Sequence, residues 1–242
     1  MTKESTTGSM STLLHAPIYL FQMGKVGSSS LRATLAERWP GPVFHGHGFE
    51  KLCDNGKRVA SWRLRLRLPI LVISPVREPI ARNVSAFFQN FHRDTGFQFA
   101  DRTWTSAELK ELFLKHCRHN VPLEWFDRHL RTAFGVDVFA RPFDVDRRWS
   151  TYRHRSVRVL VYRADLDRDE QLRVVSRFVG RTIDRWSYDN VAEDKDYAAL
   201  YADFCATVRL PTSYVRVMCE SRYCRQFWSA EEIAQTSARW SE

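Results

Sequence analysis

A short loop near the start of the chain holds the residues whose chemistry is easiest to interpret. An apolar run ends at Phe21, Lys25 follows in a small-residue turn, and a helical pattern begins at the serines. Backbone N–H groups at a helix start, the positive end of the helix dipole and an ammonium group all attract anions. The pattern predicts a phosphate- or sulfate-binding loop, although a serine-rich helix cap beside a surface lysine is an alternative. The candidate residues are Lys25, Val26, Gly27, Ser28, Ser29 and Ser30.

The loop differs from the Walker-type loop of nucleotide-triphosphate enzymes, which requires Gly-x-x-x-x-Gly-Lys-Ser/Thr. If Gly24 and Lys25 are taken as the Gly-Lys pair, Tyr19 stands where the first glycine is required. Val26 stands where the magnesium-binding hydroxyl is required. A P-loop nucleotide kinase is therefore kept only as an alternative hypothesis.

A second candidate anion site follows the apolar run at residues 69–74, which is typical of a buried strand in a parallel sheet. Arg77 comes shortly after it, and Pro79 suits the first turn of a helix that we expect to run to about Phe91. Ser85 lies roughly two turns along that helix. A guanidinium at the carboxyl end of a strand and a nearby hydroxyl predict a phosphate site. An ordinary Arg-Glu pair with a helix serine is the alternative.

Together, the two segments resemble the sulfotransferases that use 3′-phosphoadenosine 5′-phosphosulfate (PAPS). In that superfamily a Lys-x-Gly/Ala-Ser-x-Ser loop binds the 5′-phosphosulfate, and an Arg with a following Ser binds the 3′-phosphate. Residues 25–30 match the first pattern, and Arg77 with Ser85 matches the second in residue types and spacing. The segment from Arg77 also resembles the Arg-Asp-Pro motif of the Golgi carbohydrate enzymes, with Glu78 in place of Asp in a capping or orienting role. The resemblance implies PAPS as sulfuryl donor, without a metal.

Two histidines lie between these motifs, in the segment from Pro42 to Gly48. The segment resembles the Tyr-His-Gly-His sequence of heparan sulfate 2-O-sulfotransferases, which implies His47 as catalytic base, with His45 orienting or assisting it. A histidine that titrates near neutrality can remove the proton of a sugar hydroxyl. Loop histidines without a function are an alternative. A His-x-His metal site is a weaker one, since no Cys/His cluster with zinc-like spacing occurs.

Length and composition predict one domain over residues 1–242, with residues 1–15 as a flexible N-terminus. The chain has 242 residues with 44% hydrophobic content and no clear linker. Its formal net charge of +9 suits an acidic ligand such as PAPS, an anionic polysaccharide or nucleic acid. We favour a carbohydrate or other hydroxyl-bearing acceptor and no nucleic acid. A non-catalytic basic module that binds acidic glycans or nucleic acid is kept as an alternative.

The five cysteines are odd in number and widely spaced, so they do not predict a disulfide framework. The apolar run at residues 16–23 is too short to cross a bilayer. We therefore expect a cytoplasmic protein without stable membrane insertion. The Golgi relatives carry an N-terminal anchor, and its absence from this sequence points to a bacterial enzyme or a shortened chain.

The rest of the chain alternates between helical and strand patterns. Residues 157–162 predict a buried strand, and we expect helices at 105–116, 123–134, 171–179 and 197–208. Residues 62–68, in which arginines alternate with apolar residues, fit either a basic edge strand or a helix with a solvated face. The fold class predicted is α/β, a three-layer sandwich with a mainly parallel sheet. The resemblance implies the P-loop-like fold of the sulfotransferases.

Three further segments resemble a family of bacterial capsular polysaccharide synthesis proteins within the sulfotransferase superfamily. They are residues 83–90, 136–144 and 221–228. The arginines and aromatic residues of the last segment fit either an adenosine- or acceptor-binding surface or a buried aromatic helix. None of these residues is assigned to the site.

Overall fold

The structure, a computed structural model, describes residues 15–187 and 197–242. The described part of the chain forms two compact units: residues 15–76 with 126–187, and residues 77–125 with 197–242. The single domain over residues 1–242 stays a prediction. The predicted flexible N-terminus lies outside the described residues, apart from His15.

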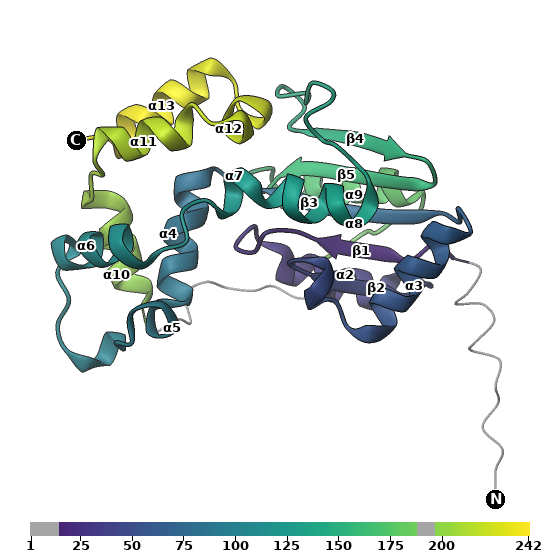
Figure 1. The fold of residues 1–242 in the computed structure, drawn as a ribbon, viewed down its shortest axis with the longest axis horizontal. Coiled ribbons are helices and arrows are strands. Elements are labelled where there is room, and N and C mark those ends of the chain that lie inside the picture. The colour runs from purple at the N-terminus through teal and green to yellow at the C-terminus, as the bar shows by residue number, and fades with distance from the viewer. Residues whose placement is uncertain (1–14, 188–196) are drawn as a thin grey trace, which may run out of the picture. The chain divides into compact units, whose positions relative to one another are not determined.

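The first unit contains a five-stranded sheet in the order β2-β1-β3-β5-β4, which can be followed in Figure 1. All neighbouring strands are parallel except β4 and β5, which are antiparallel. The predicted α/β class with a mainly parallel sheet is therefore confirmed. The strands are β1 (Ile18–Phe21), β2 (Val43–Gly46), β3 (Ile70–Val76), β4 (Trp149–His154) and β5 (Val157–Arg163).

Burial explains why the central strands are continuous apolar runs. Every residue of β1 and β3 is buried, as expected for parallel strands covered on both faces. The edge strand β4 buries only Tyr152. Because β1 runs parallel to both β2 and β3, with Tyr19 opposite Phe44 and Val72, the carboxyl ends of these three strands meet at one edge of the sheet. Residues that directly follow β1 and β2 can therefore form one site.

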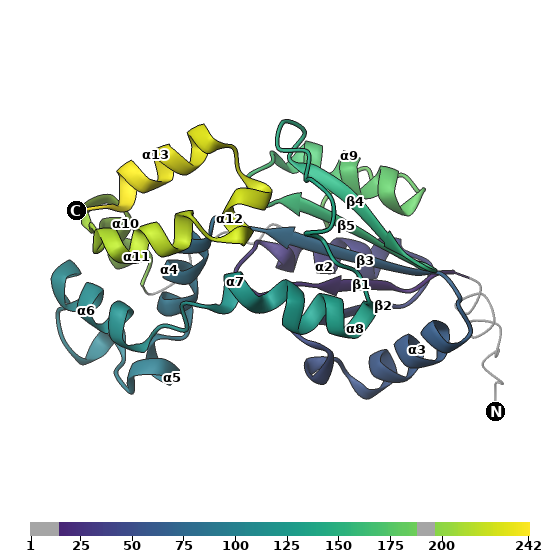
Figure 2. The same ribbon diagram turned by 45° about the horizontal axis from the view of Figure 1, so that its top comes forward.

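Helices cover both faces of this sheet and make the unit three layers thick (Figure 2). On one face, Leu31 and Leu35 of α2 and Phe178 of α9 share a core with Leu20 and Ile73. On the other face, Phe134 packs edge-on against Tyr19 and Phe21, and the Tyr19 hydroxyl donates to the Gly56 carbonyl of α3. The helical segments are α2 (Ser28–Arg38), η1 (Phe49–Lys51), α3 (Asp54–Arg65), η3 (Phe126–Arg131), α8 (Thr132–Phe134) and α9 (Arg168–Val179).

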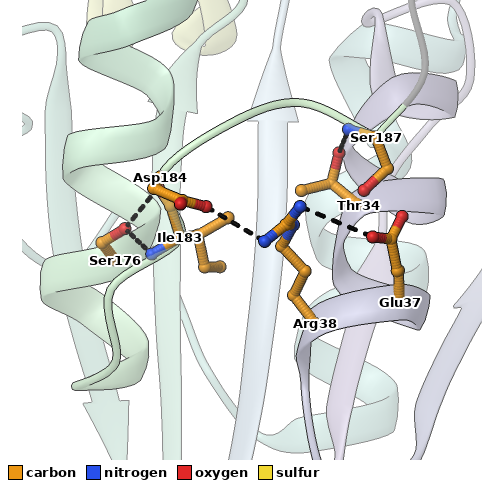
Figure 3. A network of polar contacts seen from close by, with 7 residues as sticks. All are labelled: Thr34, Glu37, Arg38, Ser176, Ile183, Asp184 and Ser187. Atoms are coloured by element: carbon orange, nitrogen blue, oxygen red, sulfur yellow. Dashed lines mark hydrogen bonds and ion pairs between the residues drawn. The ribbon is translucent and has the colours of Figure 1, made fainter.

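Helix α2, which begins at the predicted anion-binding loop, is anchored to the segment after α9 (Figure 3). The Thr34 hydroxyl donates to the Ser30 carbonyl at 2.8 Å and accepts from the Ser187 N–H at 3.1 Å. Arg38 forms an ion pair with Asp184 at 3.0 Å near the end of the helix. The contacts with Ser187 and Asp184 hold the second half of α2 through groups far away in the sequence.

The second unit is helical and is built around a cluster of aromatic side chains. Phe87 packs edge-on against Phe88, Phe91 and Phe113, and Phe204 joins the same cluster. Edge-to-face packing of this kind stabilises an aromatic core beyond the apolar area that it buries. The segments are α4 (Pro79–Gln89), α5 (Phe91–Thr95), η2 (Phe99–Asp101), α6 (Ser106–His116), α7 (Val121–Trp125), α10 (Ala198–Thr207), α11 (Thr212–Cys219), α12 (Arg222–Phe227) and α13 (Ala230–Trp240).

Several predicted elements are confirmed with shifted ends. The helix predicted at 79–91 ends at Gln89, because Asn90 leaves the helical conformation before α5 begins. The helix predicted at 123–134 is divided into α7, the π-helical η3 and α8. The ambiguous segment at 62–68 is helical through Arg65, and Arg63 is buried, where it donates to the carbonyls of Pro69 and His15.

Candidate functional site

The loop between β1 and α2 contains three residues in the left-handed region. Gly24 has φ 85°, Lys25 has φ 65° and Gly27 has φ 72°. A positive φ is uncommon for a lysine, and loops of this kind can direct successive backbone N–H groups to one side. The half-buried Lys25 belongs to this turn, while Val26 is buried. The structure thus forms a tight turn at the predicted anion-binding position.

The N-terminus of α2 lacks the side-chain cap that several other helices of this chain possess. Its N-cap is Gly27, which makes no side-chain cap hydrogen bond, and the first turn holds no acidic residue. By contrast, Thr105, Asp167 and Ser229 cap α6, α9 and α13 with side-chain oxygens. An uncapped helix start without acidic side chains has the polarity that binds an anion.

The serines at this helix start differ in exposure. Ser28 and Ser30 are buried, and Ser29 is exposed. The Ser28 Oγ accepts a hydrogen bond from the side-chain amide of Gln22 at 2.9 Å. Because the amide uses the Ser28 oxygen as acceptor, the Ser28 hydroxyl proton can be donated to a ligand.

The two predicted histidines lie at the end of the neighbouring strand and pack against each other. His45 lies on β2 and His47 follows it, with ring centroids 4.9 Å apart in an edge-on arrangement. His45 Nε2 is 3.1 Å from the Gln22 side-chain amide nitrogen. His47 Nδ1 is 2.9 Å from the Gln22 main-chain carbonyl oxygen. The loop and the histidine pair therefore meet at Gln22.

These contacts give the two histidines different protonation patterns. A carbonyl oxygen only accepts, so His47 Nδ1 carries the proton and donates it to Gln22. A neutral His47 in this tautomer has its lone pair on Nε2. His45 Nε2 faces an amide N–H and is an acceptor, so its proton lies on Nδ1. In these tautomers the basic nitrogen of His47 is Nε2, whereas the Nε2 of His45 accepts from the Gln22 amide.

Burial and positive neighbours keep His45 neutral. Its pKa is lowered from 6.5 to about 4, chiefly by burial, with repulsion from His47 and from Arg32 of α2 adding to the effect. A His45 imidazole that stays neutral at physiological pH is suited to orienting and hydrogen bonding. Arg32 itself is exposed and adds positive charge beside the histidines.

The predicted 3′-phosphate residues belong to the second unit. Arg77 directly follows β3, and its guanidinium donates to the Tyr201 hydroxyl on α10 at 3.2 Å. The Arg77 carbonyl accepts from the Tyr223 hydroxyl at 2.9 Å. Glu78 caps α4 by accepting from the N–H groups of Ile80 at 2.6 Å and Ala81 at 2.7 Å. This is the capping role expected for Glu78.

Ser85 lies on α4, half-buried, one turn before Phe88. Phe88 packs edge-on against Tyr201, the residue that accepts from Arg77. Residues three apart on a helix lie on neighbouring positions of its surface, which relates Ser85 to Phe88. Burial raises the pKa of Tyr201, which keeps its phenol neutral and able to donate.

Sequence reasoning missed three residues that lie beside the predicted residues of each unit. Gln22 and Arg32 flank the loop and the histidines, and Tyr201 lies beside Arg77. Tyr201 and Arg32 occupy ordinary helical positions, and no pattern in the sequence singles them out. Gln22 had one: a polar residue placed directly after an apolar strand and before the loop.

Two further features concern metal binding and membrane insertion. No three metal-binding side chains gather within residues 15–187 and 197–242. Across the same ranges, none of the helices has the length and apolar character of a membrane span.

Comparison with known proteins places the chain in a family. A search of curated proteins and a search of solved structures found no match. The model of the NKWYS family, "Putative capsular polysaccharide synthesis protein", matches residues 98–229, more than half of the chain. The match includes residues 136–144 and 221–228, but it begins after the loop, the histidines, Arg77 and Ser85. The chain therefore belongs to the NKWYS family, whose description is "Putative capsular polysaccharide synthesis protein".

Proposed function

We propose that this protein is a PAPS-dependent sulfotransferase that acts on a hydroxyl group of a carbohydrate. The observation that carries the proposal is the contact of two kinds of group at Gln22. One is an uncapped, left-handed loop with Lys25 at a helix start, and the other is a histidine with its basic nitrogen at Nε2. A sulfuryl transfer needs both an anion-binding loop and a base. Membership of a polysaccharide synthesis family supports a carbohydrate as acceptor.

In the proposed reaction the acceptor oxygen attacks sulfur in line with the departing phosphate. The new O–S bond forms as the bond between sulfur and the bridging phosphate oxygen breaks, and that oxygen keeps the electron pair. The acceptor proton passes to His47 Nε2, while the Gln22 carbonyl holds the ring through Nδ1–H. The products are the sulfated acceptor and adenosine 3′,5′-bisphosphate.

The residues of the loop act on the charge that develops on the leaving oxygen. Lys25 and the N–H groups from Gly27 to Ser30 supply a positive field at the start of α2. Donors already fixed where charge grows stabilise the transition state more than the ground state. In the same proposal Arg77 and Ser85 bind the 3′-phosphate of the donor, and Tyr201 adds a neutral hydroxyl beside Arg77.

The buried Val26 argues against the kinase alternative. It stands where a Walker-type loop places the hydroxyl that binds magnesium. A thermal-shift assay can compare adenosine 3′,5′-bisphosphate with ATP plus magnesium. We expect stabilisation by the bisphosphate and little by ATP. The reverse order would favour the kinase.

The reaction itself is tested with sulfur-labelled PAPS and a panel of polysaccharides. We expect label to enter at least one carbohydrate, and the product nucleotide to appear in equal amount. Label that remains in PAPS across a panel of neutral and acidic polysaccharides, together with no stabilisation by the bisphosphate, would refute the proposal.

A further inference from the structure

Gln22 is the side chain on which the loop and the histidine pair converge, although it takes no part in the chemistry. It follows β1 directly and is 1% exposed. Its amide oxygen accepts from the Gly24 N–H, and its amide nitrogen contacts Ser28 Oγ and His45 Nε2. Its main-chain carbonyl accepts from His47. A buried amide with this many partners is held in one orientation.

The orientation of the amide follows from Gly24. A backbone N–H can only donate, so the atom that faces it is the amide oxygen of Gln22. The NH2 group is then directed toward Ser28 and His45, and it has one hydrogen for each. A hydrogen donated to His45 Nε2 requires a lone pair on that nitrogen. The amide is therefore compatible with neutral His45 and incompatible with its imidazolium form.

We propose that Gln22 is a positioning residue: its amide holds His45 in the neutral Nδ1–H tautomer and fixes the Ser28 hydroxyl, while its carbonyl orients His47. The effect of this positioning on catalysis rests on the proposed sulfuryl transfer, whereas its effect on the histidine tautomers does not. With His45 held neutral as a hydrogen-bond acceptor, the pair presents one base, His47. With Ser28 held by the same amide, the start of α2 and the histidines keep a fixed relative position.

The charges around His45 act in the same direction as the amide. Arg32 on α2 and His47 both disfavour a positive His45. On the side of β1 the one titratable residue is Tyr19, whose hydroxyl donates to the Gly56 carbonyl, so the strand Ile18–Phe21 brings no charge. The nearest acidic group of the following turn is Glu50, whose carboxylate lies against Gly48 and 3.9 Å from His129 Nδ1. Gln22 therefore completes an environment that favours the neutral ring.

Two substitutions separate a positioning role from simple core filling. Gln22→Glu keeps the shape but replaces the NH2 donor by a carboxylate oxygen, which accepts from His45 Nε2–H and favours the charged ring. Gln22→Met keeps the volume and removes both polar atoms. The matched control is Gln171→Met, because Gln171 is another glutamine of this unit that donates to main-chain carbonyls, those of Ala164 and Leu166.

The first readout needs no activity. Long-range proton–nitrogen NMR of the histidine rings reports tautomer and titration in the folded protein. We expect wild-type His45 to be the Nδ1–H tautomer without titration between pH 5.5 and 8, and the control to match it. Gln22→Glu should move the His45 midpoint upward into that range, which from a pKa of about 4 requires about a thirtyfold rise in proton affinity. An Nε2–H tautomer in the wild type, or an unchanged His45 in Gln22→Glu, would overturn the proposal.

The second readout is kinetic and applies once transfer from PAPS is observed. We expect Gln22→Met to lower kcat by about tenfold to a hundredfold with a smaller change in the Michaelis constant for PAPS, and the control to stay within twofold. Equal kcat in Gln22→Met and wild type would show that the amide only fills space. If the wild type transfers no sulfuryl group and is not stabilised by the bisphosphate, the proposed function fails, and the NMR result still decides the role of Gln22. If Gln22→Glu does not fold, the wild-type tautomer and Gln22→Met decide it.

Discussion

The pH dependence of stability offers a test of the histidine environment that does not depend on any assumed reaction. His45 has a pKa of about 4 in the folded protein and an ordinary value of 6.5 when exposed. Between these values the unfolded chain binds more protons than the folded chain, so the free energy of unfolding rises with pH. The contribution of neutral His45 is therefore complete above pH 6.5 and is lost as the pH falls toward 4.

The size of this effect follows from the same two values. Each pH unit of difference corresponds to about 1.4 kcal/mol, which gives an upper limit of about 3 kcal/mol for His45. His45 is only half-buried, so solvent screening reduces the contribution. We expect the wild type to lose about 1 to 2 kcal/mol of unfolding free energy through this group between pH 7.5 and 4.5.

The assay compares wild type with His45→Gln, whose side chain has no titrating group and keeps an oxygen acceptor for Gln22. Urea unfolding is followed by tryptophan fluorescence at several pH values. The wild type should lose about 1 to 2 kcal/mol more than His45→Gln over this interval. His92→Gln removes an exposed histidine of α5 and controls for the loss of one imidazole. Parallel pH curves for wild type and His45→Gln would show that the environment of His45 does not favour its neutral form.

Three further predictions concern the proposed reaction. Arg77→Ala should weaken the binding of adenosine 3′,5′-bisphosphate by about 1.5 to 3 kcal/mol, as for a lost charged hydrogen bond, and barely change the binding of 5′-AMP in calorimetry. Equal losses of binding for both nucleotides would refute the assignment of Arg77 to the 3′-phosphate. Lys25→Ala should lower kcat more than it weakens binding of the product nucleotide. Lys57→Ala, on the surface of α3, is the control. An unchanged kcat with a raised Michaelis constant would show that Lys25 only binds the donor. His47→Ala should lower kcat by about a hundredfold to ten-thousandfold without loss of bisphosphate binding, and His45→Ala by less; reversed severity would make His45 the base.

The local elements of the site follow from short stretches of sequence. The apolar run ending at Phe21, the small residues after it and the serines that start a helix gave a strand, a left-handed turn and the helix α2. Glu78 and Pro79 similarly determined the start of α4. These features depend on residues only a few positions apart, so their causes, the allowed backbone angles and the local caps, are visible in the sequence.

The contacts between side chains of distant segments, by contrast, depend on how the chain folds. In the sequence, arginines that alternate with leucines fit either a strand or a helix. In the structure Arg63 is buried, because the carbonyls of His15 and Pro69 accept hydrogen bonds from its guanidinium. The side chains of His45 and His47 are chemically the same, so their chemistry alone does not favour either one as the base. The parallel pairing of β1 with β2 brought both to Gln22, where the amide engages His45 and the carbonyl orients His47. The protonation of each ring depends on the atom that faces it, and that atom is supplied by a strand more than twenty residues away in the sequence.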